Sequence, residues 1–91
     1  MAKPNFTQDD ISILAVKLLD KLYEATEGDE WEEREIMYIY SRIEDGSYDL
    51  TNIPLRNNVI QHLLALEFIS INSNRTSISI TNMGKNYIYS S

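Results

Sequence analysis

The chain of 91 residues contains no cysteine, a single histidine, three glycines and two prolines. The absence of cysteine excludes disulfides, Cys-ligated zinc, iron–sulfur clusters and thiol nucleophiles. His62 alone cannot form a multi-histidine metal site or a two-histidine acid–base pair, and the sequence has no glycine-rich phosphate-binding loop. We therefore expect a protein that is not an enzyme and that needs no metal and no cofactor.

The sequence also lacks long hydrophobic runs. No apolar stretch approaches the roughly 20 residues that span a bilayer, and the N-terminal segment lacks the apolar core of a signal peptide. Hydrophobic residues make up 43% of the chain and charged residues 24%, which is typical of a globular domain. We therefore expect a single domain over residues 1–91, soluble and cytoplasmic, that is stabilised by side-chain packing alone.

Positive charge is scarce, because eight Lys and Arg residues stand against fourteen Asp and Glu residues, for a net charge of −6. This balance argues against indiscriminate binding to nucleic acid or to an anionic membrane. The charges are unevenly distributed along the chain. Residues 1–50 hold five basic and thirteen acidic groups, whereas the basic groups Arg56, Arg75 and Lys85 of the second half are opposed by Glu67 alone. The two halves thus face different electrostatic environments.

Capping signals predict that a first helix begins after Thr7. Thr7 and Asp10 form a capping-box pair, and Phe6 and Ile11 are spaced as a hydrophobic staple. Apolar residues then recur at three- and four-residue intervals until Gly28, which supplies a stop. The expected buried stripe consists of Ile11, Leu14, Ala15, Leu18, Leu19, Leu22 and Ala25.

A second start signal, Asp29 followed by Glu32, predicts a helix over residues 29–43. The turn sequence EDGSYD at residues 44–49 ends it. Its start carries four carboxylates that favour the positive end of a helix dipole, namely Glu30, Glu32, Glu33 and Glu35. Its expected apolar residues are Trp31, Ile36, Met37, Ile39, Tyr40 and Ile43, with Tyr38 at the rim.

A third helix is predicted before Glu67, with Thr51 or Asn52 as its cap and Pro54 in its first turn. Its expected buried stripe consists of Leu55, Val59, Ile60, Leu63, Leu64 and Leu66. The side chains left on its outer face are Arg56, Asn57, Asn58, Gln61 and His62.

Alternating apolar residues after Glu67 predict a two-stranded hairpin with its tip at residues 73–76. The residues that share one face of each strand are Ile69 with Ile71 and Ile78 with Ile80. A final short turn or helix begins after Thr81, and its expected anchors are Met83, Tyr87 and Ile88.

The order of these elements resembles the winged helix-turn-helix family of DNA-binding domains, of the small prokaryotic or viral regulator type. The stretch VIQHLLALEFISI (residues 59–71) is similar to the family's third helix and its entry into the first wing strand. The stretch ISITNMGKNYI (residues 78–88) is similar to the ending of the wing. The resemblance covers nearly the whole chain. Two features depart from it: Glu67 and Phe68 stand where the family often has glycine, and the connection between helices two and three is longer than usual.

The resemblance implies an α+β, mainly α fold with three helices and a two-stranded wing, and sequence-specific binding of double-stranded DNA by a transcriptional regulator. Helix three would enter the major groove and the wing would contact the backbone, with a homodimer on two half-sites. Asn and Gln side chains can pair with adenine, and Arg with guanine or phosphate. The residues expected to contact DNA are Arg56, Asn57, Asn58, Gln61 and His62 on helix three, Asn74 and Arg75 on the wing, and Lys85, Asn86 and Lys3 at the margins.

Each of these residue types also has a simpler structural explanation. Any helix needs a polar solvent face, which Asn57, Asn58 and Gln61 supply, and His62 can be a rim residue. Arg75 at a hairpin tip can serve solubility alone. The four glutamates are explained more simply by the helix dipole than by a metal site, but they would repel DNA if the start of helix two approached the phosphates.

The sequence also suggests two protein interfaces, one with a different partner and one with a second copy of the chain. In the alternative function, the acidic face of helices one and two binds a basic protein partner, and the winged-helix fold serves as an interaction module. The homodimer is expected through helix one, together with the terminal aromatic turn. Near-heptad spacing on helix one is shown by Ile11, Leu14, Leu18 and Leu22, which the core of a monomer needs equally.

Overall fold

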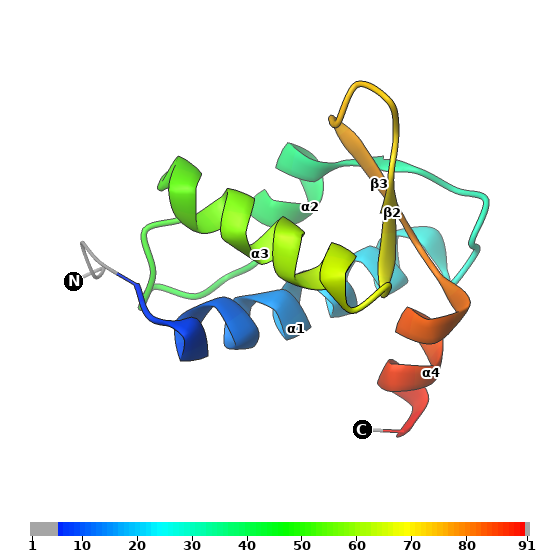
Figure 1. The fold of residues 1–91 in the computed structure, drawn as a ribbon, viewed down its shortest axis with the longest axis horizontal. Helices are drawn as coiled ribbons and strands as arrows, with labels where there is room; N and C mark the ends of the chain where they lie inside the picture. The colour runs from blue at the N-terminus through cyan, green and yellow to red at the C-terminus, as the bar shows by residue number, and fades with distance from the viewer. Residues whose placement is uncertain (1–5, 91) are drawn as a thin grey trace.

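The computed structural model describes residues 6–90, which form a mainly helical α+β fold (Figure 1). In chain order the elements are α1 (Gln8–Thr26), β1 (Arg34–Glu35), α2 (Ile36–Ser41), α3 (Ile53–Ala65), β2 (Ile69–Ile71), β3 (Ser77–Ile80) and α4 (Asn82–Ser90). The strands form one antiparallel sheet in the order β1-β3-β2, in which β2 and β3 are a hairpin. Lys3, expected at the margin of the DNA contacts, lies outside the described residues.

Helix α1 begins and ends where the sequence predicts. Thr7 Oγ1 accepts a hydrogen bond from the Asp10 amide at 3.2 Å, and Asp10 Oδ2 accepts one from the Thr7 amide at 2.9 Å. At the other end Glu27 has a φ of 54°, and Gly28 follows at 77°. Both residues are therefore in the left-handed conformation that commonly ends a helix, which confirms Gly28 as part of the stop.

The core lies between α1, the two helices α2 and α3, and one face of the sheet. The predicted stripe of α1 is confirmed as its centre, with Leu14, Leu18 and Leu22 fully buried and Ile11 nearly so. Because these four residues pack within the chain, they are not available to a partner. The homodimer stays a prediction that requires other residues of α1.

Helix α2 begins at Ile36, so the prediction of a helix over residues 29–43 is wrong in its first half. The residues just before Ile36 form β1, which pairs antiparallel with β3 and places Arg34 opposite Ile78. The Ile36 amide also donates to the Thr76 carbonyl at 2.9 Å. These hydrogen bonds to a distant part of the chain take the place of the helical hydrogen bonds that were predicted here, so tertiary pairing overrides the local start signal.

The shorter α2 changes the environment of several predicted residues. Trp31, expected in the apolar set, is 94% exposed in the turn before β1, and Met37 is also exposed. No acidic residue lies in the first turn of α2, and Glu35 caps it without a side-chain hydrogen bond. The predicted dipole-matched acidic start is therefore wrong. The remaining apolar predictions are confirmed for Ile36, Ile39, Tyr40 and Ile43.

Helix α3 follows the prediction except at its end. Asn52 Oδ1 accepts a hydrogen bond from the Leu55 amide at 3.1 Å, and Pro54 lies in the first turn. Leu66, expected to be buried, is 42% exposed because α3 ends at Ala65 and the chain then turns into β2. The buried residues confirmed in this helix are Leu55, Val59, Ile60 and Leu63.

The predicted hairpin is confirmed, with Ile69 of β2 opposite Ile80 of β3. Glu67, which precedes β2, has a φ of 62°, a left-handed conformation that favours glycine. Thr81 Oγ1 donates a hydrogen bond to the Glu67 carbonyl at 2.6 Å and so holds this turn closed. Glu67 thus adopts the backbone conformation that would suit the glycine often found near this position in the resembled family.

The terminal segment, which the sequence predicts as a short turn or helix, is a helix, α4. Its inward face contains buried Gly84 and half-buried Ile88, which are one turn apart. Met83 is turned outward by the same geometry, so its prediction as an anchor is wrong. Tyr87 is partly exposed and packs on Phe68, with ring centroids 4.9 Å apart.

Tyr40 gives a first testable prediction, because it is 2% exposed and its hydroxyl has no hydrogen-bond partner among the described residues. Tyr40→Phe removes this buried, unsatisfied oxygen and leaves the ring in place. We expect the substitution to raise the free energy of unfolding by about 1 kcal/mol, measured by urea titration at neutral pH. Tyr48→Phe is the matched control and should lower stability, since Tyr48 Oη donates to Asp10 Oδ1 at 3.2 Å.

Burial also raises the pKa of the Tyr40 hydroxyl above its ordinary value of 10. When the pH rises past 10, the unfolded tyrosine ionises while the folded one stays neutral, so this residue makes the chain less stable. Tyr40→Phe should therefore lose less stability than the wild type between neutral pH and a pH above 10. A Tyr40→Phe chain that is less stable than the wild type at both pH values would contradict the unsatisfied hydroxyl.

Candidate nucleic-acid interface

A cleft of about 480 Å³ lies between the start of α2, one flank of α3 and the β2–β3 hairpin. It brings together four of the residues predicted to contact DNA. Arg56, Asn57 and Gln61 enter it from α3, and Arg75 enters it from the hairpin. Residues far apart in the sequence thus converge on one concave surface.

The α3 side of the cleft follows from the burial pattern of the helix. Ile60 packs into the core, and its neighbours Asn57 and Gln61 are exposed on the adjoining flank. Arg56 is half-buried, and its Nη1 lies 2.6 Å from Sδ of Met37, which comes from α2. The contact holds the guanidinium at the edge of the cleft where α2 begins.

The hairpin side is organised by Asn72. Its Oδ1 accepts hydrogen bonds from the amides of Thr76 at 2.8 Å and Ser77 at 3.0 Å, which closes the turn. Arg75 has a φ of 58° in this turn and is exposed. Asn74 is exposed at the tip beside it but does not line the cleft. Asn72 was not singled out from the sequence, although an Asn at the start of a hairpin loop is a known turn signal.

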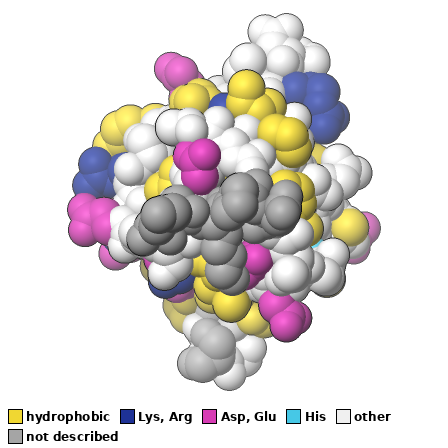
Figure 2. All heavy atoms as spheres, turned by 90° about the vertical axis from the view of Figure 1, so that its left-hand side faces the viewer, with side chains coloured by type: hydrophobic (Ala, Val, Ile, Leu, Met, Phe, Trp, Pro, Cys, Tyr) yellow, Lys and Arg dark blue, Asp and Glu magenta, His cyan; other side chains and the backbone are white. Residues whose placement is uncertain are grey.

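The electrostatics of the cleft are locally positive. Neither Arg56 nor Arg75 forms an ion pair with any carboxylate of residues 6–90. Glu35 is the carboxylate that lines the cleft, and it was predicted only as part of a helix start. Figure 2 views the molecule from the left-hand side of Figure 1. On that face the basic side chains lie apart from one another, among acidic and hydrophobic ones. Positive charge is therefore confined to a few side chains.

The other candidate residues lie elsewhere. Asn58 points along α3 and donates through Nδ2 to the Pro54 carbonyl at 2.8 Å. His62 is on the opposite flank of α3, where its Nδ1 lies 3.5 Å from Gln8 Nε2. Lys85 on α4 pairs with Glu30 at 2.9 Å, so its charge is partly neutralised, and Asn86 is exposed on the same helix.

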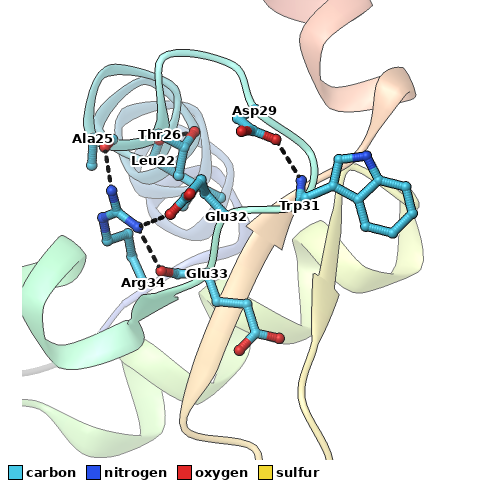
Figure 3. A network of polar contacts seen from close by, with 8 residues as sticks. All are labelled: Leu22, Ala25, Thr26, Asp29, Trp31, Glu32, Glu33 and Arg34. Atoms are coloured by element: carbon cyan, nitrogen blue, oxygen red, sulfur yellow. Dashed lines mark hydrogen bonds and ion pairs between the residues drawn. The ribbon is translucent and has the colours of Figure 1, made fainter.

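The acidic segment before β1 forms a separate structure, which we call the acidic loop (residues 27–33). Arg34 fastens it to α1, since its guanidinium donates to the Ala25 carbonyl at 3.0 Å, to the Glu33 carbonyl at 2.8 Å and to Glu32 Oε2 at 3.0 Å (Figure 3). Asp29 Oδ1 accepts from the Trp31 amide at 2.9 Å, and the indole projects away from this network (Figure 3). The loop lines no part of the cleft.

Residues 6–90 contain no helix that is long and apolar enough to cross a membrane. In the same part of the chain, no group of three or more His, Asp or Glu side chains is arranged to hold a metal ion. Comparison with protein-family models, with curated proteins and with solved structures found no match. The residues and geometry of the chain itself therefore carry the functional argument.

Proposed function

We propose that this chain is a winged helix-turn-helix protein that binds double-stranded DNA in a sequence-specific way and regulates transcription. In this proposal α3 is the recognition helix in the major groove, and the β2–β3 hairpin is the wing on the backbone. The single observation that carries the proposal is the convergence of Arg56, Asn57 and Gln61 with Arg75 around one cleft.

The chemistry of the cleft suits this role. Asn57 and Gln61 offer the paired donor and acceptor that match the adenine edge, while the two guanidinium groups suit phosphate or guanine. Both guanidinium groups are free of carboxylate partners among residues 6–90, so they can meet phosphates without breaking an ion pair. Four glutamates at the start of helix two were expected to repel the phosphates of DNA. Of these four, only Glu35 lines the cleft, because the acidic loop is separate from it.

Two cleft arginines imply a modest salt dependence. If both contact phosphates, the logarithm of the affinity should fall with the logarithm of the salt concentration with a slope of about −2. We expect fluorescence anisotropy with a labelled pool of random duplex DNA to show saturable binding that weakens roughly tenfold between about 50 and 200 mM salt. An absence of binding at the lower salt concentration would contradict the proposal.

The residues proposed to contact bases give a further testable prediction. On a duplex selected from the pool, Asn57→Ala or Gln61→Ala should cost about 1–3 kcal/mol of discrimination at one base pair. Arg75→Ala should weaken binding to all sequences alike and reduce the salt slope by about 1. Asn58→Ala is the control on the same helix, outside the cleft, and should change neither quantity. If all four variants kept the sequence specificity of the wild type, α3 would not be the recognition helix.

A second candidate function is favoured by the exposure of Trp31. Trp31 has a 94% exposed indole among carboxylates, and its backbone amide is bonded to Asp29 Oδ1. Such an indole is suited to binding a basic protein segment, because Trp is enriched at the energetic centres of interfaces. If this is the function, an arginine-rich peptide should bind the chain, and Trp31→Ala should abolish binding. Replacement of the acidic side chains Glu30, Glu32, Glu33 and Glu35 by Gln should also abolish binding of the peptide. In this case the wild type should bind no DNA.

A further inference from the structure

Among the residues that line the cleft, Met37 is the one with a readily oxidised side chain. The chain has no cysteine, so the thioethers of its three methionines are its only sulfur groups. Two of these methionines, Met37 and Met83, lie within residues 6–90. Met37 is 57% exposed at the start of α2, so its side chain is in contact with water. Met83 is 50% exposed but lines no part of the cleft.

The sulfur of Met37 lies directly against a cation. Arg56 Nη1 donates to Met37 Sδ at 2.6 Å, and this guanidinium forms no ion pair with any carboxylate of residues 6–90. A thioether is only a weak acceptor, whereas a guanidinium has five N–H donors and no acceptor. The guanidinium is therefore able to leave the sulfur for any stronger acceptor, such as a phosphate oxygen.

Oxidation by a peroxide turns this weak acceptor into a strong one. A lone pair of the sulfur attacks one oxygen of hydrogen peroxide, and the O–O bond breaks. The proton on the transferred oxygen passes to the leaving hydroxide, which departs as water. The thioether has then lost two electrons and become a sulfoxide, and the peroxide has been reduced, with no other reactant.

We propose that Met37 is a reversible oxidation site, at which a peroxide forms a sulfoxide that captures Arg56 and weakens DNA binding by the cleft. The new oxygen is bonded to Sδ, next to Arg56 Nη1, and accepts a charge-assisted hydrogen bond from the guanidinium. It therefore competes with phosphate for Arg56. Enzymes that reduce methionine sulfoxide return the side chain to the thioether. The effect on DNA rests on the proposed function, whereas the capture of Arg56 does not.

The first test compares the DNA affinity of the full-length chain before and after treatment with hydrogen peroxide. Mass spectrometry of its peptides should show sulfoxide at Met37 and at Met83, since both are exposed. We expect the affinity for random duplex DNA to fall about tenfold near 0.1 M salt, which is the value of one phosphate contact. Methionine sulfoxide reductase should restore the affinity.

Two leucine variants locate the effect, and each is compared with its own untreated form. Met37→Leu keeps Met83 and should not respond to the peroxide, whereas Met83→Leu should lose affinity as the wild type does. Met37→Gln places an amide oxygen near the position of the sulfoxide oxygen without any oxidant. It should bind DNA more weakly than Met37→Leu, and thermal melting should show that these variants remain folded, because both methionines are exposed.

The second test needs no DNA. In nitrogen-15 NMR spectra of the chain, oxidation should shift the guanidinium signals of Arg56 and slow the exchange of their protons with water. The signals of Arg34, whose donors already bond to the acidic loop and α1, should stay unchanged. Unchanged Arg56 signals would overturn the inference, as would equal losses of DNA affinity in the wild type and Met37→Leu. A reduced chain that binds no DNA would overturn the proposed function, while shifted Arg56 signals would still support the capture of this guanidinium.

Discussion

Reversal of both cleft arginines, Arg56→Glu with Arg75→Glu, is expected to lower the affinity for duplex DNA by at least about 100-fold near 0.1 M salt. Each phosphate contact releases about 0.9 counterions, so its loss at this salt concentration costs about tenfold in affinity. Glutamate would then add repulsion between the cleft and the phosphates. The effect should be measured by anisotropy with the same duplex for both proteins.

A charge-matched variant separates the cleft from the net charge. Arg42→Glu with Lys21→Glu changes the charge of the chain by the same amount, but Arg42 stacks on Tyr38 at 5.5 Å and Lys21 pairs with Glu24, both outside the cleft. This variant should stay within a few-fold of the wild type. Equal losses in both variants would indicate that net charge, rather than the cleft, controls binding.

The largest stability effect at a single small residue is expected for Gly84→Ala. A Cβ at this position would overlap the backbone carbonyl oxygen of Phe68 and crowd Ile80. The Phe68 carbonyl also accepts a hydrogen bond from the Thr81 amide at 3.1 Å, so it cannot move away freely. Alanine favours a helix over glycine by about 1 kcal/mol, but overpacking costs more, and we expect a net loss of about 2 kcal/mol in the free energy of unfolding.

Gly46→Ala is the control for this substitution, because no atom lies within 4 Å of a Cβ placed there. It should change the free energy of unfolding by less than about 0.5 kcal/mol. Both variants should be compared with the wild type by urea unfolding. If Gly84→Ala matched the wild type in stability, the close approach of α4 to the residue before β2 would be wrong.

The parts of the fold that the sequence predicts correctly depend on local signals. The capping box at Thr7 and Asp10 and the Asn52 cap mark helix starts through side chains that bond to amides three residues away. The hairpin follows from alternating isoleucines separated by a polar tip. Such signals involve residues close together in the chain, so they can be recognised without knowing how the elements pack.

The parts that the sequence does not predict depend on contacts between distant residues. Strand β1 exists because Arg34 and Glu35 pair with β3, and no local pattern marks that pairing. The exposure of Trp31 follows from the same change, because it removes this residue from the helix in which it was expected to be buried. Met83 is exposed because Gly84, not a large residue, faces the core from α4.

The sequence predicted the candidate site only in part. The polar face of α3 could be identified from periodicity, but its division between two flanks depends on how α3 packs against α1 and the hairpin. That packing brings Gln61 to the cleft and His62 to a groove on the opposite flank, between α1, the end of α3 and α4, although the two residues are adjacent in the sequence. Met37 and Glu35 enter the cleft only because α2 starts late, which the sequence did not indicate.

The central claim is that the cleft binds duplex DNA, and the most direct test is to map amide chemical-shift changes when random duplex DNA is added at about 50 mM salt. We predict that the changes concentrate at residues 35–37, 56–57, 60–61 and 73–76, which line the cleft or form the hairpin tip. Amides that do not change, or changes centred on residues 27–33, would contradict the claim and indicate the acidic loop as the functional surface.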